Sequence, residues 1–178
     1  MSILKRGLRG APVRRLQERL EIEADGDYGA ATQDAVREWQ RRNGLDPDGI
    51  AGPDTFAAMG LNELVLLRMG SKGAVVRLLQ SALETGADGH FGAKTRQAVV
   101  DFQREHDMEP DGMAGPTTLA KLGLDGFSAD VVARAQLRTD EQTYEGDKLP
   151  YQSATSTHDD AEPAPDRSVW GKVKGWFS

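Results

Sequence analysis

The sequence predicts an all-α fold made of two copies of one small three-helix unit, followed by a tail of different composition. Three observations support this prediction: a long internal repeat, apolar residues at helical spacing in each copy, and little of the alternation that marks strands. Residues 4–61 align with residues 67–124 without a gap, and about 30 aligned positions are identical, far more than unrelated segments share. We therefore divide this part of the chain into a first repeat, 1–61, and a second repeat, 62–125.

The first helix of each repeat follows from its apolar spacing. In the first copy Val13, Leu16 and Leu20 recur at i, i+3 and i+7, which places them on one helix face. Gln17, and its equivalent Gln80, lie on this buried side. A buried amide must be hydrogen-bonded, so we expect both glutamines to bond backbone groups of nearby glycine turns.

The second and third helices are bounded by glycine and proline. The second helix carries Trp39 on its apolar stripe and ends near Gly44, a usual left-handed cap. The second copy has Asp107 in place of Gly44, and aspartate tolerates left-handed backbone better than most residues. The third helix begins at Pro53, where a missing N–H leaves no bond unmade, and stops at Gly60.

Two Asp-Gly turns, 25–29 and 48–52, connect the helices of the first repeat, because Asp-Gly pairs supply the positive φ values of tight turns. A unit of roughly 60 residues buries only about 60% of its unfolded surface and is marginal alone. We therefore expect the two repeats to share a face, with Leu64, Val65 and Leu66 as candidates for the shared contact.

Each copy follows the pattern L-x-x-G-x-x-G-x-x-V-x-x-L-Q-x-x-L, then D-G-x-[FY]-G-x-x-T-x-x-A-V-x-x-[FW]-Q, then P-D-G-x-A-G-x-x-T. This pattern resembles the type 1 peptidoglycan-binding domain, the three-helix module attached to many cell-wall hydrolases. The resemblance covers both repeats. It implies a compact helical fold and noncovalent attachment to the bacterial cell wall.

The glycine turns are the expected binding surface. They would present backbone amides, an aromatic edge and polar side chains around a shallow groove, which suits the hydroxyls, acetamido groups and peptide bonds of muropeptides. The candidate contact residues are Asp25, Tyr28, Gln40 and Asp48 in the first repeat and Asp88, Phe91, Gln103 and Asp111 in the second.

Several of these residues also have a purely structural interpretation. The four aspartates can accept N–H groups of their own turns. We expect Trp39 and Phe102 to pack in the core rather than on sugar rings, since they lie on the apolar stripe of the second helix. Tyr28 and Phe91 lie at loop-to-helix junctions, where either a packing role or a ligand contact is open.

Composition and motifs exclude several other classes of protein. The chain of 178 residues has no Cys, which excludes a disulfide scaffold, a thiolate zinc site and a cysteine nucleophile. Its net charge of −6 argues against nucleic-acid binding. The Asp-Gly turns lack the alternating ligands of a calcium loop, and the three His residues are dispersed without an H-E-x-x-H motif, so we expect no metal or cofactor.

No apolar run is long enough to cross a bilayer, and none follows the basic N-terminus. We therefore expect synthesis in the cytoplasm without a secretory signal peptide, followed by action at the bacterial cell wall.

The composition changes after the repeats. Residues 126–138 are expected to contain one more helix, with Ser128 as its N-cap, and residues 139–167 form an acidic linker that we expect to be disordered. Residues 168–178 are amphipathic and too short to be a stable helix alone, so we expect them to dock on a protein partner or, as a rival use, on a membrane surface. The docking residues would be Val169, Trp170, Val173, Trp176 and Phe177.

The sequence thus favours a non-catalytic protein that binds peptidoglycan through two modules while its tail attaches to a partner. Linked sites can raise avidity by about 10²–10⁴. One alternative is a structural adaptor that anchors a phage particle or contractile injection device to the wall. The other is a small lysin, although little chain remains outside the repeats for a catalytic cleft.

Overall fold

The structure, a computed structural model, describes residues 3–136 and 144–145. The first repeat contains α1 (Ala11–Arg19), α2 (Ala30–Arg42) and α3 (Pro53–Met59). The second contains α4 (Ala74–Ala82), α5 (Ala93–Glu105) and α6 (Pro116–Lys121). A 3-10 helix, η1 (Asn62–Leu64), joins the repeats, and α7 (Ala129–Gln136) follows them, within the range where one more helix is expected. The prediction of a helical fold is confirmed.

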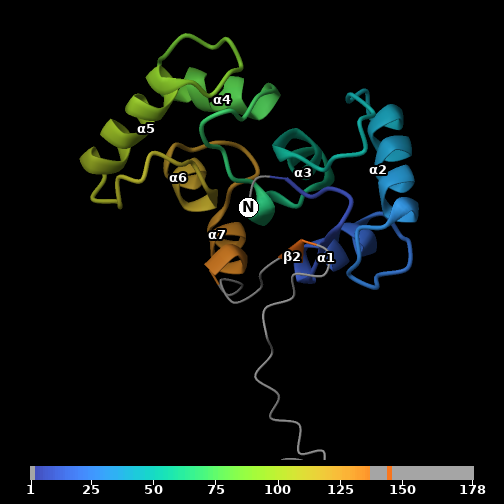
Figure 1. The fold of residues 1–178 in the computed structure, drawn as a ribbon. Helices are drawn as coiled ribbons and strands as arrows, with labels where there is room; N and C mark the ends of the chain where they lie inside the picture. Colours follow the sequence, from blue (N-terminus) through green and yellow to red (C-terminus); the bar gives the residue numbers. More distant parts are fainter. Residues whose placement is uncertain (1–2, 137–143, 146–178) are drawn as a thin grey trace, which may run out of the picture.

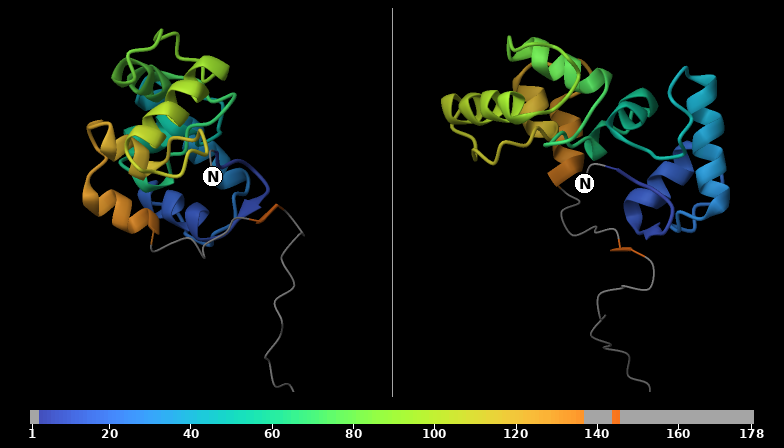
Figure 2. Two further views of the ribbon diagram at one scale, coloured as in Figure 1. Left: turned by 90° about the vertical axis from the view of Figure 1, so that its left-hand side faces the viewer. Right: turned by 45° about the horizontal axis from the view of Figure 1, so that its top comes forward.

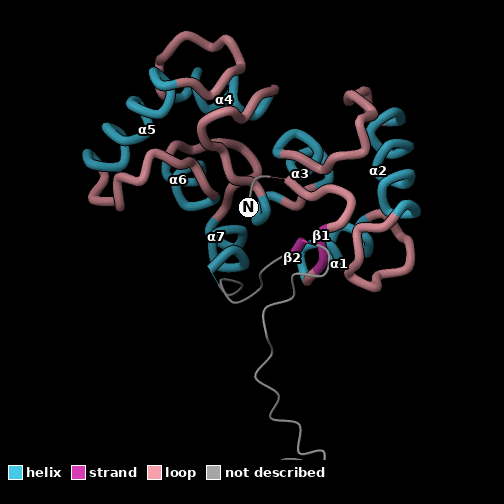
Figure 3. The backbone as a smooth tube through the Cα atoms, viewed as in Figure 1, coloured by secondary structure: helices cyan, strands magenta, loops and turns pink. Residues whose placement is uncertain are grey.

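The two repeats form two lobes that lie side by side. Figure 1 and the right-hand view of Figure 2 show α2 and α5 on the outer sides, with α3 and α6 between them. Long loops occupy much of each lobe, as the tube in Figure 3 shows. This arrangement places the loops between helices, where the Asp-Gly turns lie, at the surface of both lobes.

Several helix ends use the left-handed backbone region, but not always with glycine. Asp107 has φ 54° at the position where Gly44 has φ 70°, so the expected aspartate cap is confirmed. Glu21 and Glu84, which follow α1 and α4, have φ 57° and 52°. A non-glycine residue in this region is strained by about 1–2 kcal/mol, which the surrounding packing must offset.

One cluster of buried apolar side chains runs through both repeats, from Leu4 to Val131. Val13 and Leu16 on α1 are fully buried, as the apolar spacing predicts. A core that crosses the boundary between the repeats makes them one folded body, which is consistent with the marginal stability of a single repeat of this size.

The segment between the repeats supplies part of this shared core. Val65 is 1% exposed and Leu64 packs against the core, whereas Leu66 lies at the surface of a groove. The Nδ2 of Asn62 donates to the Gly126 carbonyl at 2.7 Å, which ties η1 to the segment before α7. Helix α7 packs on η1 and α6, so it covers the joint between the lobes.

In the part of the chain that the structure describes, strand structure is confined to short pairings. Strand β1 (Leu8–Arg9) pairs antiparallel with β2 (Tyr144–Glu145), beside α1 in Figure 3. Isolated bridges join Leu4 to Ala51 and, at the equivalent place in the second repeat, Leu67 to Ala114. These bridges hold the start of each repeat against its second Asp-Gly turn.

Candidate functional site

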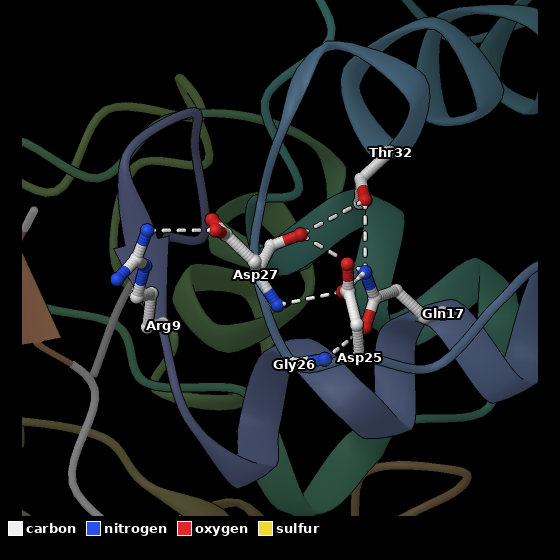
Figure 4. A network of polar contacts seen from close by, with 6 residues as sticks. All are labelled: Arg9, Gln17, Asp25, Gly26, Asp27 and Thr32. Carbon is white, nitrogen blue, oxygen red and sulfur yellow. Dashed lines mark hydrogen bonds and ion pairs between the residues drawn. The ribbon is translucent and has the colours of Figure 1, made fainter.

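A buried glutamine holds each Asp-Gly turn in one shape. Gln17 on α1 is 1% exposed. Its Nε2 donates to Asp25 Oδ1 (2.6 Å), to the Asp27 carbonyl (3.0 Å) and to Thr32 Oγ1 (3.0 Å). Its Oε1 accepts the N–H of Gly26 (Figure 4), and the two atoms lie 2.7 Å apart. The prediction that Gln17 bonds backbone groups of the turn is confirmed, and two side chains add to its partners.

The same glutamine network occurs four times. Gln40, Gln80 and Gln103 each donate to an aspartate eight residues later and to a carbonyl ten residues later, and each accepts the N–H of a glycine nine residues later. Gln40 and Gln80 also donate to a threonine fifteen residues later. Gln17 and Gln40 lie 23 positions apart, as do Gln80 and Gln103. Each repeat is therefore itself built from two similar helix–turn units.

The residue after each Asp-Gly pair joins the network through its main chain. Its N–H donates to the aspartate Oδ1 at 2.8 Å in all four turns, and its carbonyl accepts from the glutamine. The four side chains at this position differ in chemistry: they are those of Asp27, Ile50, His90 and Met113. The network therefore fixes the backbone without prescribing this side chain.

The turn hydrogen bonds also lower the pKa of two exposed carboxylates. The N–H of Asp27, and then the Gln17 amide, hold the pKa of Asp25 below its usual value. The N–H of His90, and then the Gln80 amide, lower the pKa of Asp88 in the same way. Both carboxylates therefore stay ionised to a lower pH than an aspartate without these hydrogen bonds.

Four of the expected contact residues have buried side chains. Tyr28 is 0% and Phe91 2% exposed, so both are core residues. The Tyr28 hydroxyl donates to the Gly49 carbonyl at 3.1 Å, and burial raises the pKa of Tyr28. Gln40 and Gln103 are each 2% exposed, and their amides serve the turn networks.

The stripe aromatics of the second helices are less buried than expected. Trp39 is half-buried and packs against the core. Phe102 is also half-buried, and its ring stacks on His106 with 4.0 Å between ring centroids.

The four expected aspartates are exposed, and two of them line equivalent grooves. The first groove has a volume of about 660 Å³ and the second about 380 Å³. All ten residues of the second groove are the 63-residue equivalents of ten residues of the first. The first-repeat residues of the first groove are Ile3, Gln40, Leu45, Asp46, Asp48, Ile50, Gly52, Pro53, Asp54 and Thr55. The second groove is lined by Leu66, Gln103, Met108, Glu109, Asp111, Met113, Gly115, Pro116, Thr117 and Thr118.

The equivalent positions give the two grooves the same chemistry. Each has carboxylates, such as Asp48 or Asp111, beside apolar side chains, such as Ile50 or Met113. The first groove is larger because residues 68–73 of the second repeat form a further wall. The apolar lining was not predicted from the sequence, although the alignment of the two repeats places Ile50 directly on Met113.

The first turn of the first repeat borders a separate hollow. Asp25 lines it together with Arg9 and Arg14, and Arg9 forms an ion pair with Asp27 at 2.9 Å. Asp88 is exposed at the equivalent turn, where Lys72 pairs its backbone with His90. The two first turns thus differ in the side chain that follows the Asp-Gly pair, which is Asp27 in the first repeat and His90 in the second.

Among the residues that the structure describes, no three His, Cys, Asp or Glu side chains are grouped to hold a metal ion. None of the helices within the same residues has the length and apolar character needed to span a bilayer. The expected docking residues Val169, Trp170, Val173, Trp176 and Phe177 lie outside the described residues.

Comparisons with known proteins find one family model twice in this chain. A family model described as "Putative peptidoglycan binding domain" matches residues 9–59 and again residues 72–122. Over 156 residues the chain is 33% identical to a "Probable N-acetylmuramoyl-L-alanine amidase" of Bacillus licheniformis, covering 67% of this chain and 44% of the relative. Over 162 residues it is 33% identical to the N-acetylmuramoyl-L-alanine amidase CwlL of the same organism, covering 68% and 45%. The chain thus spans less than half the length of these curated relatives.

Among solved structures, the Burkholderia AP3 phage endolysin is 22% identical to this chain. That alignment covers 82% of this chain and 66% of the endolysin, with a TM-score of 0.35.

The relatives correct the expected function. The sequence favoured a non-catalytic wall binder or a particle adaptor, but the curated relatives that match two thirds of the chain are amidases. The expectation of a peptidoglycan-binding fold is confirmed by the family model. With two matched segments that together exceed half of its length, the chain belongs to the putative peptidoglycan binding domain family and carries that domain twice in tandem.

Proposed function

We propose that this chain serves cell-wall lysis: its two repeats bind peptidoglycan and hold an N-acetylmuramoyl-L-alanine amidase activity at its substrate. The observation that carries the proposal is the 33% identity to two such amidases across two thirds of the chain. We assign the hydrolytic step to the part of such an amidase that this chain does not match.

The grooves support the binding half of the proposal. Each groove places carboxylates beside apolar side chains, next to an Asp-Gly turn that its glutamine holds rigid. Binding sites commonly combine an apolar lining with a few fixed polar groups. Asp48 and Asp111 suit the hydroxyl and amide N–H groups of muropeptides. Ile50 and Met113 suit acetamido methyl groups and sugar faces.

Attachment matters for lysis because the substrate is an insoluble polymer. A bound repeat keeps a tethered enzyme at an effective concentration near the millimolar range, so that each cut is followed by another nearby. The wall-binding repeats would therefore raise the lytic rate at low enzyme concentration without altering the chemical step.

Sedimentation with purified sacculi tests the binding sites. We expect the full chain to sediment with sacculi but not with chitin, which lacks stem peptides. The double variant Ile50→Ala and Met113→Ala should sediment less, and it should stay folded because the turn networks use only the main chain at these positions. Leu78→Ala, at an exposed residue of α4 outside both grooves, is the matched control. Equal sedimentation of all three proteins would contradict the assignment of the grooves.

Two assays test the link to lysis. An excess of the full chain should slow the solubilisation of sacculi by the amidase CwlL, because both would occupy the same attachment sites. The gene product that carries this chain should release new L-alanine amino termini from sacculi. A gene product that binds sacculi but never releases these termini would contradict the lytic half of the proposal.

A further inference from the structure

The two grooves are connected through a third hollow. This middle hollow has a volume of about 390 Å³. It shares Arg68 and Met69 with the first groove, and Asp111 and Met113 with the second. The three hollows therefore form one surface that crosses both repeats without a break, and we call this surface the binding track.

Exposed apolar side chains gather on the binding track. Among the described residues, four large apolar side chains are exposed, and Ile3 (39%), Met69 (54%) and Met113 (36%) all line the track. Clustered exposed apolar groups mark interaction surfaces, and methionine side chains adapt their shape to a ligand. Met69 occupies the joint between the first groove and the middle hollow, where a continuous ligand would pass.

The two halves of the track are held in a fixed relation. The carboxylate of Asp54 in the first repeat accepts the N–H groups of Ala74 and Val75 in the second, and Val65 between them is buried. Because the core is continuous across this joint, the repeats cannot turn independently to reach two separately oriented ligands.

We propose that the binding track takes one peptidoglycan strand along its length, rather than one strand for each repeat. This inference rests on the proposed function and specifies its ligand. The track offers carboxylates at Asp48 and Asp111 and cations at Arg68 and Arg96. A strand whose stem peptides carry both carboxylates and free amines meets partners of opposite sign here, whereas a polymer of a single charge would meet repulsion.

Titration of the full chain with soluble peptidoglycan fragments of graded length tests this proposal. The fragments are prepared by partial digestion of sacculi, and isothermal titration calorimetry gives the affinity and the number bound. We expect one long fragment for each protein, and an affinity that rises at least about tenfold from the shortest fragments to those that span both grooves.

Variants in the middle of the binding track distinguish one strand bound along the whole track from one strand bound by each repeat. Arg68→Ala with Met69→Ala should lower the affinity for long fragments about tenfold and for the shortest fragments less than about twofold. Both side chains are exposed, and Met69→Gln alone gives a milder second variant if the double variant unfolds. Leu78→Ala should change neither affinity.

The outcomes distinguish this inference from the proposed function. Two long fragments for each protein, or one affinity at all lengths, would overturn the single-strand track while sedimentation with sacculi continued. Loss of sedimentation by the unmodified chain would overturn the proposed function itself.

Discussion

The carboxylate of Asp54 on α3 accepts the main-chain N–H of Ala74 at 2.8 Å, and also that of Val75 at 2.9 Å, so a residue of the first repeat caps the first turn of a helix in the second. The equivalent of Asp54 in the second repeat is Thr117, which is exposed on α6. This hydrogen-bonded contact between the two lobes therefore comes from a position where the repeats differ.

Removing this cap should weaken the joint between the lobes. Asp54→Ala leaves two N–H groups of α4 without their acceptor, and we expect a loss of about 0.5–2 kcal/mol in the free energy of unfolding. Urea denaturation measures the loss, and hydrogen exchange should show faster exchange at the amides of Ala74 and Val75. Thr117→Ala is the matched control and should change stability by less than about 0.5 kcal/mol. Equal losses in both variants would contradict the capping role.

Gly73 leaves the room that Asp54 needs. It has φ 123°, and an added Cβ would overlap the Asp54 carboxylate. Gly73→Ala should therefore combine backbone strain with loss of the cap, lowering the free energy of unfolding by more than about 2 kcal/mol. Gly70→Ala, at φ 86° with nothing near the added carbon, isolates the strain alone and should be milder in the same denaturation experiment. A Gly70 variant that is as unstable as the Gly73 variant would argue against the overlap.

The buried glutamines should be far less replaceable than their exposed counterparts. Gln17→Leu removes the partners of the Gly26 N–H, Asp25 and Thr32, and we expect a loss of at least about 3 kcal/mol in thermal or urea unfolding. Gln17→Glu keeps the shape but sets a second carboxylate against Asp25, so it should be no milder. The same change at the exposed Gln97, Gln97→Leu, should stay within about 0.5 kcal/mol. A Gln17→Leu protein of normal stability would refute the structural role of the network.

Acid should loosen the first turn of each repeat. Because turn hydrogen bonds lower the pKa of Asp25 and Asp88 in the folded protein, the unfolded chain binds protons more readily at these groups. Their contribution to stability is therefore complete above the unfolded pKa of about 4, and it is lost as the pH falls through the folded pKa.

Melting temperatures between about pH 7 and about pH 3 measure this effect. Asp25→Asn with Asp88→Asn should show a shallower fall in melting temperature on acidification than the unmodified chain. Asp125→Asn, on the exposed segment before α7, is the control for removing a carboxylate. If the melting temperature of the double variant fell on acidification as steeply as that of the unmodified chain, the loss of stability in acid could not be assigned to Asp25 and Asp88.

The helices could be predicted because their signals are local. Val13 and Leu16 repeat at helical spacing, and both are fully buried on α1. The role of Gln17 also followed from one physical rule, that a buried amide must find partners. Burial of Tyr28 could not be read in this way, because a residue at a loop-to-helix junction has no periodicity to show which side of it faces the core.

The binding surface could be predicted only in part. The Asp-Gly turns indicated Asp48 and Asp111, which line the two grooves. The first groove, however, combines Ile3 with residues 45–55 and 68–73, and no local pattern joins three such distant segments. The similarity of the two turns within one repeat was present in the spacing of Gln17 and Gln40, but the longer and stronger 63-residue repeat obscured it.

The residue after each Asp-Gly pair is held in the turn by main-chain hydrogen bonds. Its side chain can therefore vary, at four positions of the chain, while the backbone of the turn stays the same. These positions hold an acid, a branched aliphatic side chain, an imidazole and a thioether, at Asp27, Ile50, His90 and Met113. A library randomised at these four positions would therefore diversify recognition while melting behaviour held constant, much as hypervariable loops diversify on an antibody framework.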